Sequence, residues 1–323
     1  MAPQPVTGEH TQSGEQLRGK RSERGVDVRQ IRLVATDVDG TLLDPQGCLT
    51  PRTLAAIQAA SAAGVTVALA TARRWTGASH TASQLDFHGP LIVFDGAMIR
   101  SYPDGEVLSA APFDRATAQR SAEAMSSYGL QPIMQFCDER AEHLRVAEEV
   151  AHSAWSADYL DVFRGQIQFC PVAELCEVAA DPMRLVAFAP VSILRRVAVD
   201  LASPAFGRQL LLTGNFGMAE LTLFSTDASK GNALTMLARS LDIPLEETMA
   251  VGDGLNDISM LQVAGLGVAM GQAPRRVRAS ADVVTASNAE DGLAQALETF
   301  VLGARRNFSR VAGAPDAAKR MEV

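Results

Sequence analysis

Two aspartates near the start of the chain are spaced so that one carboxylate could attack phosphorus with the help of the other. Asp37 and Asp39 follow the apolar run Ile31 to Thr36 and precede Gly40. Alternation predicts that both carboxylates lie on the same side, and the glycine lets the backbone turn sharply. A divalent cation would offset their repulsion, and Mg²⁺ suits hard oxygen ligands. Asp37 could then act as nucleophile and Asp39 as acid and base, with a solvated acidic turn as the open alternative.

A second pair of carboxylates follows another apolar run. The segment Thr248 to Val251 is typical of a buried strand and leads into Gly252-Asp253-Gly254-Leu255-Asn256-Asp257. Asp253 and Asp257 lie four residues apart, one helical turn if a helix begins early. We predict that Asp253 is a direct or near-direct Mg²⁺ ligand and that Asp257 and Asn256 orient water or the ligands. A calcium loop of the EF-hand type is excluded because its fixed ligand pattern and closing glutamate are missing.

Two other segments offer groups that bind phosphate. Thr71 ends the apolar run Val65 to Ala70, and Arg73 follows it. A hydroxyl beside the N–H groups that open a helix can hold a phosphoryl oxygen, and the arginine could add a charged fork. Judged alone, Thr71 could equally be an ordinary helix cap. Ser229 is a candidate helix N-cap, so Lys230 is expected in the first turn of that helix. There its ammonium could neutralise phosphate and the nucleophile, with a surface lysine as the alternative.

These side chains share one position, the carboxyl end of a predicted strand or a nearby helix start. The runs Ile31 to Thr36, Val65 to Ala70 and Thr248 to Val251 are short and apolar, like buried strands of a parallel sheet. A helix from Pro51 to Gly64 makes the first unit a right-handed βαβ crossover. Because open α/β sheets bind ligands at the carboxyl ends of their strands, we predict an α/β fold with a Rossmann-like, doubly wound parallel sheet.

The middle of the chain follows a different pattern. Met98 to Leu108 predicts a hairpin, and the later strands and helices do not alternate as in βαβ units. We therefore predict a discontinuous core domain, 30–97 and 214–302, with an inserted α+β cap domain at 98–213. The core pattern is expected to resume at Leu221 to Phe224. The spacing of the polar side chains in the insert specifies no ligand: Asp138, Arg140, His143, His152 and Arg184.

Length and composition exclude several classes of protein. At 323 residues the chain exceeds twice the prior of roughly 150 residues for one domain, which favours two domains plus tails. A net charge of −8 argues against general binding to nucleic acid or an anionic membrane. No run approaches the roughly 18 apolar residues of a membrane span. Four cysteines without a CxxC pair predict reduced thiols in a cytoplasmic protein.

Both ends of the chain have the composition of tails. Residues 1–29 are rich in Gly, Pro, Gln, Ser and charge, which predicts a disordered tail. Their basic cluster lacks the apolar region of roughly 7–15 residues that an export signal requires. Residues 303–323 are also expected to be mobile, and a solvated end is favoured over a partner-binding role.

Four motifs, taken in order, resemble those of the haloacid dehalogenase superfamily. They are Asp37-Val38-Asp39-Gly40-Thr41-Leu42, Thr71, Lys230 and Gly252-Asp253-Gly254-Leu255-Asn256-Asp257. The large insert between the second and third motifs is similar to the C2-type cap of the Cof-type branch, subfamily IIB. The ending Glu290-Asp291-Gly292-Leu293-Ala294 resembles the same branch. The resemblance covers about residues 31–302.

The resemblance implies a Mg²⁺-dependent phosphatase that works through an aspartyl-phosphate. Asp37 would form this intermediate, and Asp39 would protonate the leaving alcohol and then activate water. The implied metal ligands are Asp37, the backbone carbonyl of Asp39, and Asp253, with Asp257 close by. The substrate phosphate would be held by Thr71, Lys230, Arg73 and Gly96.

Two residues depart from the family pattern. Ala72 stands where members often have glycine, and Asp95 stands where the asparagine of an Asn-Gly-Ala turn is common. The negative charge of Asp95 near the phosphate predicts a narrower substrate range or weaker binding.

The resemblance implies a small soluble phosphomonoester as substrate, of the sugar, polyol or flavin type, enclosed as the cap closes. One alternative is a phosphosugar mutase of the phosphomannomutase type, which would release little phosphate and need a bisphosphate activator. A non-catalytic phosphometabolite-binding protein is the other. We expect a monomer or homodimer that binds neither nucleic acid nor a membrane.

Overall fold

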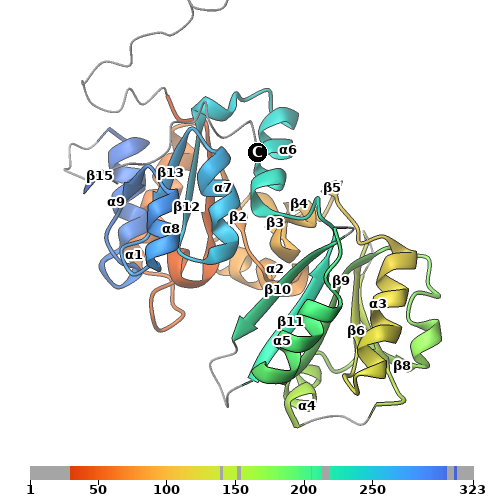
Figure 1. Cartoon of the computed structure of the whole chain (residues 1–323). Coiled ribbons are helices and arrows are strands. Elements are labelled where there is room, and N and C mark those ends of the chain that lie inside the picture. Colours follow the sequence, from red (N-terminus) through yellow and green to blue (C-terminus); the bar gives the residue numbers. More distant parts are fainter. Residues whose placement is uncertain are drawn as a thin grey trace, which may run out of the picture.

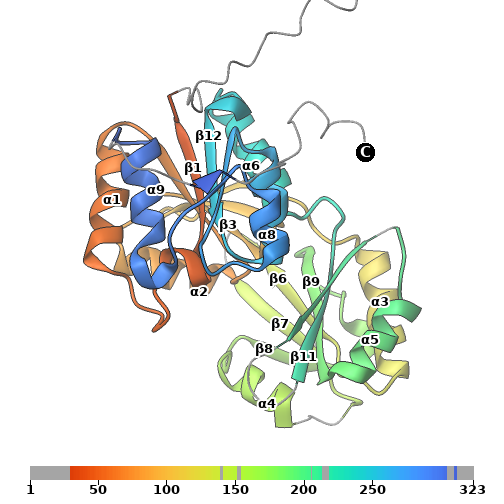
Figure 2. The same cartoon turned by 60° about the vertical axis from the view of Figure 1, so that its left-hand side comes forward.

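Two sheets organise the part of the chain that the computed structural model describes. The described residues are 30–138, 141–150, 154–204, 206–212, 218–303 and 309–310. A nine-stranded sheet forms the core and a six-stranded sheet forms the cap beside it (Figures 1 and 2). The predicted fold class, an α/β core with an inserted cap, is confirmed. Among the described residues no helix combines the length and apolar character needed to cross a membrane.

The core strands form one mixed sheet with a mainly parallel centre. In spatial order they are β15 (Ser309–Arg310), β14 (Val283–Val284), β13 (Leu266–Ala269), β12 (Thr248–Gly252), β1 (Leu33–Asp37), β2 (Thr66–Ala70), β3 (Gly89–Val93), β4 (Met98–Tyr102) and β5 (Val107–Ala110). β1 pairs in parallel with both β12 and β2, and Asp37 is in register with Ala70. The chain order reverses between β12 and β1, so their carboxyl ends frame the crevice where such sheets bind ligands.

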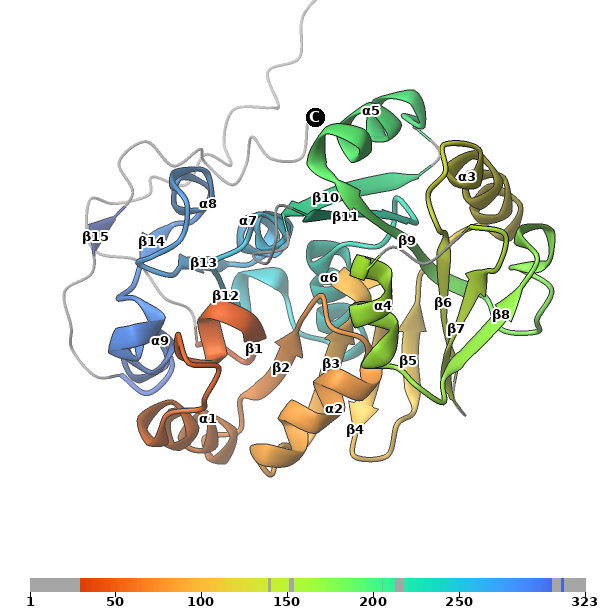
Figure 3. The ribbon, with the colours of Figure 1, turned by 90° about the horizontal axis from the view of Figure 1, so that it is seen from below.

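Helices cover both faces of the core sheet (Figure 3). One face packs against α1 (Pro51–Ala62), α2 (Trp75–Gln84) and α9 (Gly292–Phe300). The other packs against α6 (Lys230–Ser240), α7 (Ile258–Val263) and α8 (Arg275–Ser280). The central strands are therefore buried on both sides, which is why their sequences are continuous apolar runs. The Thr50 side chain accepts from the Thr53 N–H and caps α1, as the Pro at its first position indicates.

The cap is a six-stranded sheet with helices on both faces. In spatial order its strands are β10 (Gly207–Leu212), β11 (Met218–Phe224), β9 (Pro182–Pro190), β6 (Ile133–Cys137), β7 (Glu142–Ala147) and β8 (Ile167–Cys170). α3 (Arg115–Ser127) and α5 (Val191–Asp200) pack on one face and α4 (Ala154–Asp161) on the other. The strands and helices of the cap therefore do not alternate as βαβ units. This agrees with the sequence pattern of the insert.

Both predicted boundaries of the insert need correction. β4, which begins at Met98, pairs antiparallel with β3, and β5 pairs antiparallel with β4, so both strands extend the core sheet. β11 contains Leu221 to Phe224 and pairs with β10 and β9, so the prediction that the core resumes there is wrong. The chain therefore passes from the core to the cap after β5 and returns to the core after β11. A period-two pattern identifies a strand but does not say which sheet it joins.

The predicted tails lie mostly outside the described residues. All of 1–29 falls there, as do 304–308 and 311–323. Ser309 and Arg310, predicted to be mobile, instead form β15, which pairs antiparallel with β14 at the edge of the core sheet.

Candidate active site

A buried lysine lies between two of the candidate carboxylates. Asp37 is the last residue of β1, and Lys230 is the first residue of α6. The Lys230 Nζ donates to Asp37 Oδ1 at 2.5 Å and to Asp257 Oδ1 at 2.6 Å, and none of its side chain is exposed. The Ser229 hydroxyl accepts from the Asn232 N–H, so the predicted helix cap is confirmed and fixes where the lysine enters. The surface-lysine alternative is wrong.

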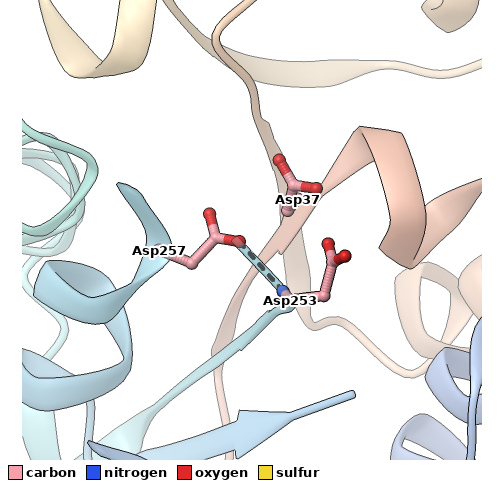
Figure 4. Close-up of side chains that lie close together, drawn as sticks. All are labelled: Asp37, Asp253 and Asp257. Atoms are coloured by element: carbon pink, nitrogen blue, oxygen red, sulfur yellow. Dashed lines mark hydrogen bonds between the residues drawn. The ribbon is translucent and has the colours of Figure 1, made fainter. Parts of the chain in front are cut away.

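Three carboxylates converge near this lysine, and Figure 4 shows these three side chains. Asp37, Asp253 and Asp257 each offer an oxygen within 4.8 Å of the others. Asp257 Oδ2 accepts from the N–H groups of Asp253 and Gly254, at 2.9 and 2.7 Å. The Thr41 hydroxyl donates to Asp253 Oδ1 at 3.1 Å. The lysine and these donors occupy both oxygens of Asp257, whereas Asp37 and Asp253 keep lone pairs for another ligand.

The charges in this cluster are unbalanced. Burial raises the pKa of Asp37, and the neighbouring Asp257 and Asp253 add to that rise while Lys230 opposes it. Burial and Asp257 likewise raise the pKa of Asp253. Burial lowers the pKa of Lys230, but its carboxylate neighbours outweigh burial and raise it overall. A divalent cation would relieve the excess negative charge, so the donor set fits Mg²⁺.

Two glycines allow the loops to approach the carboxylates closely. A Cβ on Gly40 would lie 2.5 Å from Asp253 Oδ2, and one on Gly252 would lie 2.5 Å from the Asp257 carboxylate. Gly40 also has φ of +86°, which side chains rarely adopt. Glycine is therefore required at both turns for the acidic cluster to form.

Asp39 does not join the carboxylate cluster. β1 ends at Asp37, and the wide turn Val38–Leu42 breaks the alternation on which the prediction of a close pair rested. The Asp39 side chain is 59% exposed. It accepts from Arg73 Nε at 2.8 Å and from Nη2 at 2.5 Å. The carboxylates that crowd Asp37 are thus those of the distant loop, and a metal contact through the Asp39 backbone carbonyl stays a prediction.

Thr71 and Arg73 are engaged within the protein. Thr71 is buried, and its Oγ1 accepts from the Arg73 N–H at 3.0 Å. A hydroxyl that accepts one hydrogen bond can still donate another. The Arg73 guanidinium holds Asp39 and donates from Nη1 to Thr81 Oγ1 at 2.7 Å. The guanidinium therefore binds Asp39, whereas the sequence predicted that it binds the substrate phosphate. Phosphate binding by these two residues stays a prediction.

The turn Phe94–Gly96 brings a further carboxylate near the lysine. Asp95 has φ of +57°, and its Oδ1 accepts from Asn256 Nδ2 at 2.7 Å. Asn256, predicted to orient water or metal ligands, thus holds this turn. A Cβ on Gly96 would lie 2.2 Å from the carbonyl oxygen of Ser229, so glycine allows close contact with the start of α6. Phosphate binding by Gly96 stays a prediction.

The cap adds two charged residues that spacing in the sequence does not specify. Arg184 Nη1 lies 3.9 Å from Asp95 Oδ2, and Glu142 Oε2 accepts from the Thr76 N–H at 3.0 Å. Leu144 and Val146, which follow Glu142 at every second position, are typical of a strand and assign no role to its carboxylate. Two other cap candidates have local roles: the His143 ring stacks on Phe136 and the Asp138 carbonyl accepts from Arg100. Two candidates lie outside the described residues: Arg140 and His152.

Comparisons with known proteins agree on one family. The family model for haloacid dehalogenase-like hydrolases matches residues 34–297. Phosphatase YwpJ of Bacillus subtilis (strain 168) is 29% identical over 284 residues, which is 83% of this chain and 99% of that protein. Pyridoxal phosphate phosphatase YbhA of Escherichia coli (strain K12) is 28% identical over 279 residues, 84% and 99% respectively. A solved structure described as a subclass IIB sugar phosphatase has a TM-score of 0.66 at 25% identity, covering 83% of this chain and 98% of that one.

Proposed function

Because the chain belongs to the haloacid dehalogenase-like hydrolases and is a phosphatase of that family, we propose that it hydrolyses a small phosphomonoester with Mg²⁺ through an aspartyl-phosphate on Asp37. The observation that carries this proposal is the buried Lys230, which holds Asp37 Oδ1 at 2.5 Å. With one oxygen fixed, Asp37 Oδ2 is the oxygen that attacks phosphorus. The ammonium favours the ionised carboxylate that this attack requires.

Asp39 is the proposed acid and base. As Asp37 Oδ2 bonds to phosphorus and the bond to the leaving oxygen breaks, Asp39 gives its proton to that oxygen. Asp39 then takes a proton from a water whose oxygen bonds to phosphorus while the bond to Asp37 Oδ2 breaks, which releases phosphate and restores the carboxylate. Its side chain is 59% exposed and thus open to solvent, and the Arg73 guanidinium fixes its position before substrate enters. The Thr71 hydroxyl and Lys230 are proposed to hold the transferring phosphoryl group.

The residues present fit a divalent cation. Asp37, Asp253 and the backbone carbonyl of Asp39 would hold Mg²⁺, with Asp257 close by. When bound, the ion supplies positive charge that offsets the carboxylates and the phosphoryl oxygens.

The substrate is proposed to be a small phosphorylated metabolite. The relatives whose names specify a substrate include phosphatases of pyridoxal phosphate, of 5-amino-6-(5-phospho-D-ribitylamino)uracil, of phosphoglycolate and of a sugar phosphate. We also propose a cytoplasmic location, because all four cysteines are free. Burial raises the pKa of Cys137 to about 11, so this thiol stays protonated and unreactive at neutral pH.

Phosphate release from sugar, polyol, nucleotide, pyridoxal and flavin phosphates tests the proposal. The panel is run with and without Mg²⁺, for the wild type and for Asp37→Asn. Metal-dependent release that the substitution abolishes is the expected result, and the preferred ester names the substrate class. Isomerisation of a phosphosugar with little release, dependent on a bisphosphate, would indicate the mutase instead. Substrate binding without turnover would indicate a phosphometabolite-binding protein.

A further inference from the structure

The segment Thr71–Thr76 joins β2 to α2 and carries two groups of the proposed site, Thr71 and Arg73. Its helix begins without a cap of its own, because Arg74 at the cap position makes no side-chain hydrogen bond to the first turn. The first N–H groups of a helix have no partner within it and need one from elsewhere. Here the partner comes from the other body of the molecule.

Glu142, the first residue of the cap strand β7, serves as this helix cap. Its Oε2 accepts from the Thr76 N–H at 3.0 Å and also from the Thr76 hydroxyl. The residue is 8% exposed. A carboxylate at a helix N-terminus satisfies a free donor and interacts favourably with the helix dipole. The core helix α2 is thus capped by a residue 66 positions further along the chain.

Arg74 strengthens the same contact from the core side. Its side chain is buried and lies over the Phe163 ring, with Cζ 3.4 Å from the ring centroid. Its Nε lies 3.5 Å from Glu142 Oε1. A buried guanidinium needs such partners, which exist only while the cap is docked.

Arg184 holds the same segment from the cap strand β9, which is separated from β7 by β6. Its Nη1 donates to the Ala72 carbonyl at 3.0 Å and lies 3.9 Å from Asp95 Oδ2. Within the cap, its Nε donates to Gln135 Oε1 at 2.6 Å, and the Gln135 amide donates to the Tyr159 hydroxyl. Cap side chains therefore orient the Arg184 guanidinium toward the backbone between Thr71 and α2.

We propose that Glu142 and Arg184 are positioning residues that fix Thr71 and Arg73 when the cap docks. The docked cap then completes the phosphate-binding segment, in addition to covering the substrate. This inference rests on the proposed function, because that function assigns roles to Thr71 and Arg73. Its consequence is that loss of either cap residue slows the enzyme on every phosphomonoester, whatever the leaving group.

Kinetics of Glu142→Ala and Arg184→Ala test this consequence. Two esters with unlike leaving groups are used, the preferred panel member and p-nitrophenyl phosphate, together with inhibition by inorganic phosphate. We expect kcat to fall about tenfold on both esters and the inhibition constant of phosphate to rise similarly, because small misplacements of catalytic groups are costly. The exposed cap residues Glu148 and Arg195 provide matched controls, whose alanine variants should match the wild type. A raised KM confined to the preferred ester would instead assign leaving-group recognition and overturn the proposal.

Two further variants separate positioning from charge. Glu142→Gln keeps an oxygen that can accept from the Thr76 N–H, so it should recover kcat to within about threefold of wild type. Failure of this variant would assign the loss to the missing charge beside Arg74 and overturn the capping role. The double variant Arg184→Ala, Asp95→Asn should remain slow. Full recovery would mean that the unpaired Asp95 charge was the whole cause, which overturns the positioning role of Arg184.

Hydrogen exchange gives a readout that needs no turnover. In Glu142→Ala, amides of residues 71–82 should exchange at least about fivefold faster, while those of β12 keep wild-type protection. Unchanged exchange over 71–82 would overturn the inference even if the enzyme were active. Conversely, a wild type without phosphatase activity would refute the proposed function, while the exchange data would still decide whether the cap orders this segment.

Discussion

The core and the cap both bring charged side chains to the site, but the charges are balanced differently. In the described part of the core, three carboxylates gather beside one ammonium, that of Lys230, which donates to two of them, and the cluster keeps an excess of negative charge. Between core and cap the charges pair one to one, Arg74 with Glu142 and Asp95 with Arg184. Unbalanced buried charge is costly unless a further ion joins it, so the core cluster indicates a metal site. The paired charges between core and cap leave no excess charge for an ion to offset, which indicates docking.

The two regions also fix their groups by different means. The core groups lie at strand ends and a helix start within one continuous sheet. The cap groups touch the core only through contacts between the bodies. Substitutions of the core groups should therefore nearly abolish kcat, whereas substitutions of the cap groups should lower kcat only moderately.

The substitution Asp37→Asn gives the strongest test of the difference between the core groups and the cap groups. The amide cannot form the phosphorylated intermediate, so kcat should fall by about 10⁴-fold or more, measured as phosphate release on the preferred ester. Circular dichroism and thermal unfolding should show a folded protein, because the substitution removes one of the crowded charges. If the loss were only about tenfold, like that expected for Glu142→Ala, the distinction between core and cap would fail.

Removal of the single core ammonium should have the next largest effect. Lys230→Met leaves two buried carboxylates without their cation, so we expect kcat to fall by about 10²- to 10³-fold. The free energy of unfolding in EDTA should fall by about 3 kcal/mol, measured by urea denaturation. Arg239 in the last turn of the same helix is exposed, and Arg239→Ala provides the control. Wild-type stability in Lys230→Met would show that the carboxylates do not depend on the lysine.

Mg²⁺ should stabilise the folded protein through the core cluster. A concentration about 100 times Kd contributes about 2.7 kcal/mol, which corresponds to a rise in Tm of roughly 5 °C relative to EDTA. In Asp253→Asn this rise should largely vanish, while Tm in EDTA should match or exceed that of the wild type because a crowded charge is gone. Calorimetry with and without the ion makes both measurements. An undiminished rise in Asp253→Asn would place the ion elsewhere.

The smallest expected effect concerns the pair between core and cap. Asp95→Asn removes a negative charge near the phosphate but keeps an oxygen that can accept from Asn256, so kcat/KM should change by only about two- to fivefold. Any increase should be largest for the most highly charged esters of the panel. Identical kinetics on every ester would show that Arg184 already cancels the charge of Asp95.

Local features of the fold could be predicted from the sequence because they depend on neighbouring residues. The apolar runs before Asp37 and Asp253 identified central strands, and Thr50 and Ser229 were recognisable helix caps. Sheet membership could not be predicted in the same way. The hairpin that begins at Met98 and the strand that contains Leu221 have similar patterns, and only long-range pairing assigned one to the core and the other to the cap.

The sequence alone determined where the reactive groups stand along the chain. Apolar strands that end in carboxylates or a hydroxyl must deliver them to one edge of a parallel sheet, since such strands share a direction. Only the tertiary structure decided which charges pair. Asp39 pairs with Arg73 34 residues away, Asp37 with Lys230 193 residues away, and the Thr76 N–H with Glu142 66 residues away. Such partners are chosen by distance in space, which depends on how the sheets pack and how the cap docks.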